Sequence, residues 1–138
     1  GIKLPQEAIA MAVEGQWRTY SITLAWSGYD ETLRMVCTFE MEPPTEKLPE
    51  VYELLNLIND QCWAGAFTYW LDQKFMVYRY GLVLTGGQVA GPEQIDTMIS
   101  AAVMSAERYY PALQLLVWGG RSPIDALQVA IAEAYGRA

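Results

Sequence analysis

Two segments, residues 18–26 and 33–41, constrain the fold most strongly, because their hydrophobic residues recur at every second position. In each segment one set of alternate side chains is mostly large and apolar, and the other set is smaller or polar. A period of two is typical of half-buried β-strands. Residues 8–13 repeat the pattern weakly and are followed by a turn at Gly15. The sequence therefore predicts a three-stranded antiparallel meander.

A helix and a second hairpin are predicted after the meander. Pro43 and Pro44 should end the third strand, because proline has no backbone donor for a sheet. From residue 45 to about residue 62, apolar residues recur at three- and four-residue steps, which is typical of an amphipathic helix. Residues 66–71 and 75–85 are rich in aromatic and β-branched residues and are separated by a short polar loop. These two strands complete a predicted sheet of five.

The C-terminal part of the sequence predicts two helices. Residues 92–118 have a helical period, in which Pro111 should cause a kink or a restart. Gly119-Gly120 suits the left-handed residue that ends a helix, and Ser122-Pro123 suits the start of another, which we expect to run to about Tyr135. The predicted fold is α+β, with a five-stranded antiparallel sheet (meander, helix, hairpin) packed as one layer against helices.

The composition favours one domain that binds proteins or small molecules. A chain of 138 residues can bury enough surface for a core of its own. The net charge of −7, with only nine scattered Lys and Arg residues, argues against nucleic acid or an anionic membrane as a partner. The sequence has no apolar run of the roughly 20 residues that a membrane span needs, and its first residues do not resemble a signal peptide.

No catalytic, metal-binding or cofactor-binding site can be identified in the sequence. Histidine, the commonest general base and metal ligand, does not occur in the chain. Cys37 lies in a predicted strand and Cys62 at the end of a predicted helix, so both are interpreted as free, buried thiols. Free thiols indicate a reducing compartment, and we expect a cytoplasmic protein that is not an enzyme.

One face of the sheet is a candidate interface, because a single layer of helices covers only the other face. Its mixture of aromatic, Thr and Arg side chains is typical of partner-binding surfaces. Homodimer formation or binding of another protein would use this face; cover by residues that precede the chain, or ordinary exposure, are the alternatives. The residues predicted to lie on it are Trp17, Thr19, Thr68, Trp70, Val77, Arg79 and Val83.

Four blocks of the sequence resemble the bacterial YbjN domain family, and the resemblance extends from about Ile9 to Tyr135. Each block alone would be weak, but together they are specific. The blocks are Gly15-Gln16-Trp17 with Tyr20 and Trp26, Tyr52-Glu53-Leu54-Leu55-Asn56-Leu57-Ile58-Asn59, Trp63-Ala64-Gly65-Ala66-Phe67, and Arg108-Tyr109-Tyr110-Pro111-Ala112 leading into Trp118-Gly119-Gly120-Arg121-Ser122-Pro123.

The resemblance implies a fold like that of secretion chaperones and a role as a sensory transduction regulator. It supplies no catalytic residues. Family members have a helix before the first strand, and we expect that this chain starts too late to include it. A dimer is implied only by analogy with the chaperone-like fold, since a shared fold does not fix a function.

Three functions are weighed from the sequence. The preferred one is a non-enzymatic regulatory or chaperone-like domain that recognises a protein segment through its sheet face or groove edges. The alternative is a small-ligand sensor with an aromatic pocket between sheet and helices, lined by Tyr78, Tyr80, Tyr109 and Trp118. An enzyme would need carboxylates, or Arg79, Arg108 and Arg121, gathered in one cleft.

Overall fold

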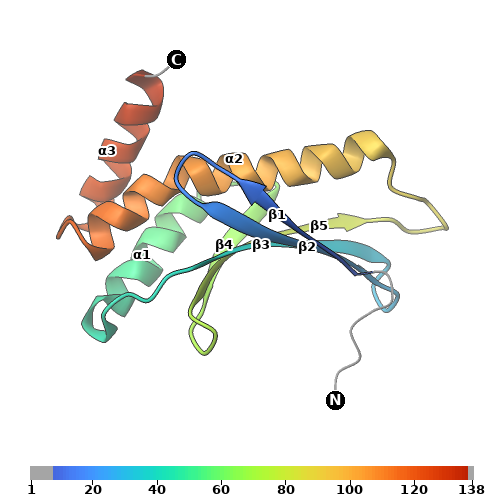
Figure 1. Ribbon diagram of the computed structural model, residues 1–138, viewed down its shortest axis with the longest axis horizontal. Coiled ribbons are helices and arrows are strands. Elements are labelled where there is room, and N and C mark those ends of the chain that lie inside the picture. The colour runs from blue at the N-terminus through green and yellow to red at the C-terminus, as the bar shows by residue number, and fades with distance from the viewer. Residues whose placement is uncertain (1–7, 137–138) are drawn as a thin grey trace.

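The computed structural model describes residues 8–136, with side chains for residues 8–134, and confirms the α+β fold (Figure 1). The expectation that the chain starts too late to include the family's first helix concerns residues outside this range. The elements, in chain order, are β1 (Ile9–Glu14), β2 (Thr19–Ser27), β3 (Thr32–Glu40), a 3₁₀ turn (Thr45–Lys47), α1 (Leu48–Asn59), β4 (Gly65–Trp70), β5 (Phe75–Val83), α2 (Pro92–Val117) and α3 (Pro123–Gly136).

The five strands form one antiparallel sheet in the order β1-β2-β3-β5-β4. The meander and the second hairpin are joined by the β3–β5 pairing, in which Cys37 lies opposite Tyr78. β1 and β4 are consequently the two edge strands, and β3 is the central one. Figure 1 shows α2 running across one face of the sheet, while the other face has no helix over it.

The core lies between the sheet and the helices. The strands contribute alternate side chains such as Ile22 and Met35, and α2 contributes Met98 and Leu113; all four are less than 2% exposed. Flexible methionine side chains fill irregular gaps well, which suits the junction of a twisted sheet and a long helix. The space between the layers is therefore filled.

α1 lies beside the edge strand β4 and closes it. Asn59, the last residue of the helix, donates its side-chain N–H to the carbonyl oxygen of Phe67 at 2.9 Å and accepts the Phe67 backbone N–H at 2.7 Å. The amide group thus stands in for a neighbouring strand. The helix ends here, three residues before the predicted end at Cys62, and a turn follows.

α2 and α3 have the predicted ends; of the two outcomes predicted at Pro111, a kink or a restart, the restart does not occur. α2 is continuous through Pro111 and bends towards its C-terminal end (Figure 1). Gly120 has a φ of 69°, so it is the left-handed residue that turns the chain after the helix. Ser122 accepts the backbone N–H of Asp125 at 3.2 Å, as predicted for the cap of α3.

Candidate functional site

The face of the sheet turned away from the helices is called the open face below. Residues paired across antiparallel strands point to the same side, so Thr38, Val77 and Thr68 form one row across β3, β5 and β4. Six of the seven residues predicted for this face have their side chains on it. They are Thr19, Thr68, Trp70, Val77, Arg79 and Val83. Whether the face binds anything stays a prediction.

Trp17, the seventh predicted residue, lies on the other side of the molecule. Its ring centre is 6.5 Å from that of Tyr110 on α2, and it packs against the core. The prediction extended the period of two from Thr19 back to Trp17. Gly15 and Arg18 are already hydrogen-bonded to each other, so Trp17 is one of the two turn residues, where strand alternation no longer applies.

Val77 faces the open side but is fully buried, with an exposed fraction of 0%. It does not belong to the main hydrophobic core. Thr38 and Thr68 flank it on the neighbouring strands. Val83, near the end of β5, is 61% exposed. Because its side chain is fully buried, Val77 cannot contact a partner on the open face.

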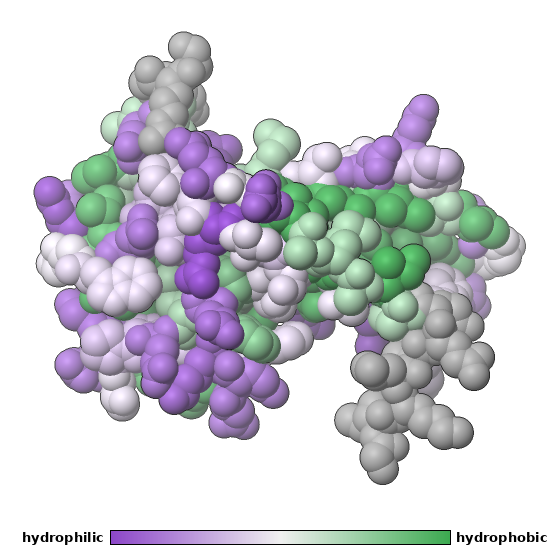
Figure 2. All heavy atoms as spheres, in the orientation of Figure 1, coloured by the Kyte–Doolittle hydropathy of each residue, from purple (hydrophilic) through white to green (hydrophobic). Residues whose placement is uncertain are grey.

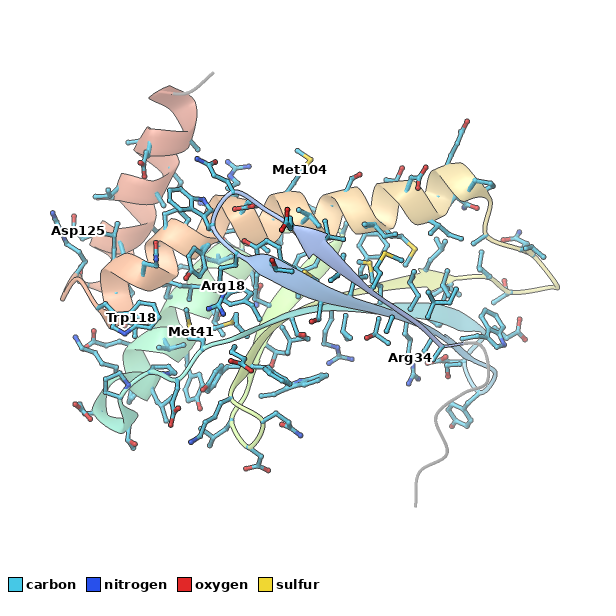
Figure 3. All side chains as sticks on the ribbon, in the orientation of Figure 1. Arg18, Arg34, Met41, Met104, Trp118 and Asp125 are labelled. Carbon is cyan, nitrogen blue, oxygen red and sulfur yellow. The ribbon has the colours of Figure 1, made fainter. Side chains whose placement is uncertain are left out.

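A hollow of about 1090 Å³ lies on the open face beside β4. Arg34, Arg79 and Trp70 line it together with small residues of β4 and β5. Figure 3 shows Arg34 on the side of the sheet away from α2. Arg34 is held by Asp30 at 2.8 Å, and its hydrogen bond lowers the pKa of that carboxyl group. The hollow is thus lined by small, aromatic and charged side chains, and its one carboxylate, Asp30, is paired with Arg34.

Arg79 differs from the other cations that the structure describes. Two of the nine Lys and Arg residues, Lys3 and Arg137, lie outside the described side chains. Of the remaining seven, four have a carboxylate partner within 4.0 Å, and Arg18 and Arg108 lie over aromatic rings. Arg79 is the one described cation with neither, and it is exposed.

Trp63 was not predicted as a site residue, yet it is the most exposed tryptophan in the described chain, at 97%. It belongs to the loop between α1 and β4 and lines the hollow on the open face. It also lines a groove on the helix side, so it stands at the border of both. Its position after the helix period ends at Asn59 is the only sequence signal that could have identified it.

The groove on the helix side has a volume of about 850 Å³ and lies between the α1–β4 loop and α2. Tyr109 donates its hydroxyl hydrogen to Gln61 at 3.0 Å across this groove. Met104 is 70% exposed and points away from the sheet (Figure 3). The helix-side groove is therefore a second concave surface, besides the open-face hollow, that has exposed apolar residues at its border.

Glu107 of α2 fixes the β1–β2 turn, a role that the sequence did not predict. Its carboxylate accepts the backbone N–H of Gln16 through Oε1 and that of Trp17 through Oε2 at 3.3 Å. Glycine suits position 15, because a Cβ there would crowd the Glu107 carboxylate and the Tyr20 ring. The sequence shows an acidic residue among the mainly apolar residues of the helix, but not that it lies next to the β1–β2 turn.

Tyr20 is buried next to this contact. Its hydroxyl lies close to the Glu107 carboxylate, but no partner among the described residues has normal hydrogen-bond geometry. Burial, and then the Glu107 charge, raise the pKa of Tyr20 well above its ordinary value. The tyrosine therefore stays neutral and serves the core.

The residues that each of the two rival functions requires are not all gathered at one site. Tyr78 and Tyr109 line the helix-side groove, whereas Trp118 lies beside Met41 at the far end of the protein (Figure 3). Among the arginines, Arg79 lines the open-face hollow, Arg108 the helix-side groove, and Arg121 pairs with Asp125 at 2.9 Å. Neither the aromatic pocket nor the arginine cleft is assembled.

The two cysteines are not disposed for nucleophilic or metal chemistry. Both are free thiols. Burial raises the pKa of Cys37 to about 12 and raises that of Cys62, against the opposing charge of Arg108, so little thiolate forms. Within the described residues, no three or more His, Cys, Asp or Glu side chains cluster as metal ligands do. None of the described helices is long and apolar enough to cross a membrane.

Comparison with known proteins identifies the family. The chain matches the YbjN family model, described as "Putative bacterial sensory transduction regulator", over residues 4–115. The match includes three of the blocks noted in the sequence and the first part of the fourth, and ends before Trp118–Pro123. No curated protein and no solved structure matches the chain. Because the family model covers most of its length, the chain belongs to the YbjN family.

Proposed function

We propose that this chain is a non-enzymatic regulatory or chaperone-like interaction domain that binds an extended, acidic segment of a partner protein on its open face. The observation that carries the proposal is Arg79, an exposed cation in a hollow with no ion pair among the described residues. The family's description as a regulator supports the general role.

Because the protein as a whole is acidic, an acidic segment should be attracted mainly to Arg79. The net charge is −7, so most of the surface repels an acidic segment. Arg34 and Lys74 are already neutralised by Asp30 and Glu42. An acidic segment would therefore find its favourable contact at Arg79, whose guanidinium can hold a carboxylate through two parallel hydrogen bonds.

Two tryptophans supply apolar contacts on either side of the cation. Trp63 is almost fully exposed and Trp70 is half-buried, and both line the hollow with Arg79. Tryptophan and arginine are the residues that most often carry binding energy at protein interfaces. The segment bound here would thus combine a carboxylate with neighbouring apolar side chains.

A small-ligand sensor has less support. Its expected aromatic residues lie at separate surfaces, and the region between sheet and helices is filled by side chains such as Met76 and Leu113. We place the domain in the cytoplasm, since Cys37 and Cys62 are both unpaired.

Binding of synthetic peptides tests the proposal. The probes are fluorescent ten-residue peptides that alternate Glu with Leu or Trp, and matched peptides with Lys in place of Glu. We expect the acidic peptides to bind more tightly, and Arg79→Glu to weaken them at least tenfold, about 1.4 kcal/mol. Arg34→Gln, in the same hollow but with its charge already paired, is the control and should change binding little. Equal binding of both peptide series, or no effect of Arg79→Glu, would contradict the proposal.

A further inference from the structure

The direction of the backbone groups on the edge strand β1 follows from the hairpin. Gly15 donates its N–H to the carbonyl oxygen of Arg18 at 2.7 Å, so these two residues form a hydrogen-bonded pair. Such pairs alternate with non-hydrogen-bonded ones along an antiparallel ladder. Ala10 and Ala12 therefore turn their N–H and C=O groups away from β2. Within the described residues no group accepts or donates to them.

Within the described residues, this edge has none of the features that usually prevent strand pairing. Residues 8–13 contain no proline, no lysine and no charge, and Glu14 is the first charged residue of the strand. Natural proteins normally protect an exposed edge with such residues or cover it with another element. The outer side of β1 is thus competent to accept a further strand.

The side chains of β1 that face the helices extend the apolar surface to the edge. Met11 and Val13 are only partly buried against the core, and Ile9 is 57% exposed. Figure 2 shows hydrophobic residues gathered over β1 and under the N-terminal half of α2. An added strand would cover apolar side chains as well as pair backbone groups.

Glu107 keeps this edge in position. By accepting the N–H groups of Gln16 and Trp17, it ties the end of the β1–β2 hairpin to α2. A strand that is already ordered loses little conformational entropy on binding. The edge is consequently preorganised.

We propose that the occupant is β1 of a second copy of this chain, paired antiparallel with Met11 at the two-fold axis. In this register Ala10 exchanges hydrogen bonds with Ala12 of the second copy, and Ile9 meets Val13 of the second copy. Glu14 lies opposite Ala8, so the two Glu14 carboxylates are at opposite ends. The edge is therefore complementary to itself in backbone groups, apolar side chains and charge.

The pairing has a consequence for the whole assembly. An antiparallel edge-to-edge pair has its two-fold axis perpendicular to the sheet, so two five-stranded sheets become one continuous sheet with both open faces on the same side. The inference does not depend on the proposed peptide binding, because β1 and Arg79 belong to different parts of the sheet.

Molar mass in solution is the first test. For wild type at high micromolar concentration we expect about twice the monomer mass of 15.5 kDa by light scattering. Ala12→Pro removes an outward N–H and leaves the bonds to β2 in place, so it should give a folded monomer. Ala12→Val keeps the N–H and should remain dimeric. A monomeric wild type, or a folded Ala12→Pro variant with the mass of wild type, would overturn the inference.

A disulfide test does not depend on how well the proline variant folds. In a Cys62→Ser background, Met11→Cys should form a covalent dimer under mild oxidation, because two-fold-related residues in a non-hydrogen-bonded pair have Cα atoms about 4.5 Å apart. Ser21→Cys, on the open face of the adjacent strand, is the control and should form no covalent dimer. Cross-linking at position 21 and not at position 11 would place the contact on the open face and refute edge pairing.

Discussion

The two edges of the sheet are treated in opposite ways. On β4, the outward backbone groups of Phe67 are both bonded to the side chain of Asn59, and α1 lies alongside. On β1, the outward groups of Ala10 and Ala12 have no partner among the described residues. One edge is capped at Phe67 by an amide that imitates a strand, and the other is left ready for a strand at Ala10 and Ala12.

The difference shows how a single polar residue can determine whether an edge strand is free to pair with another strand. An unpaired backbone group next to apolar surface is costly, so the β4 edge beside α1 needs Asn59. β1 is anchored at its turn by Glu107 instead, and the anchor leaves the strand's outer edge untouched. Closure and anchoring can therefore be tested separately by changing one residue each.

Asn59→Ala should have the largest effect on stability. It removes both hydrogen bonds from Phe67 and leaves a part-buried N–H and C=O unpaired, which we expect to cost about 3 kcal/mol of unfolding free energy. Urea denaturation followed by tryptophan fluorescence measures the loss. The variant should also form larger oligomers in solution, because the β4 edge becomes available for pairing.

Asn56→Ala provides the matched control for this substitution. Asn56 lies on the same helix and is exposed, so its replacement should change the unfolding free energy by no more than about 0.5 kcal/mol. If the two variants were equally stable, the Asn59 amide would not be what closes the edge.

Most of the fold could be predicted from local patterns. The alternation in β2 and β3 and the helical steps in α1 identify elements whose burial is set by their own sequence. Trp17 was misplaced because a two-residue turn interrupts the alternation, and the turn's position depends on pairing between distant residues. Pro111 was expected to cause a kink or a restart, and the helix continues through it without a restart.

The candidate site was less predictable, since its key features depend on what distant residues do. Arg79 could be placed on the open face by counting along β5. That it lacks a partner follows only once Arg34 and Lys74 are seen to be paired. The strand order, which leaves β1 and β4 at the edges, involves contacts far apart in the chain and is not encoded in any local pattern.

Glu107→Ala should destabilise the protein by about 2 kcal/mol, because two backbone N–H groups of the hairpin turn lose a charged acceptor. The loss of stability should be confined to the β1 edge. Hydrogen exchange should become faster at the amides of Met11 and Val13, whereas β4 should be unaffected. Asp96→Ala, which removes an exposed carboxylate from the same helix, is the control. Equal acceleration in β1 and β4 would mean that Glu107 supports the fold as a whole rather than the β1 edge.

The central strand β3 can be compared with both edges through its buried residue Cys37. The predicted change in unfolding free energy is the smallest of the three. Burial raises its pKa from 9.0 to about 12, so the native state holds the proton more tightly than the unfolded state does. The stabilisation is complete below pH 9.0 and is lost as the pH rises towards 12. Between pH 8 and about pH 10, wild type should lose about 1.4 kcal/mol more unfolding free energy than Cys37→Ala, in which this titration is absent. Urea denaturation at the two pH values measures the difference, and Cys62→Ala, which replaces a less buried thiol, should resemble wild type more closely.

If Cys37→Ala lost as much stability as wild type between the two pH values, the Cys37 thiol would be accessible to solvent in the native state. The centre of the sheet would then not differ from its edges in solvent access.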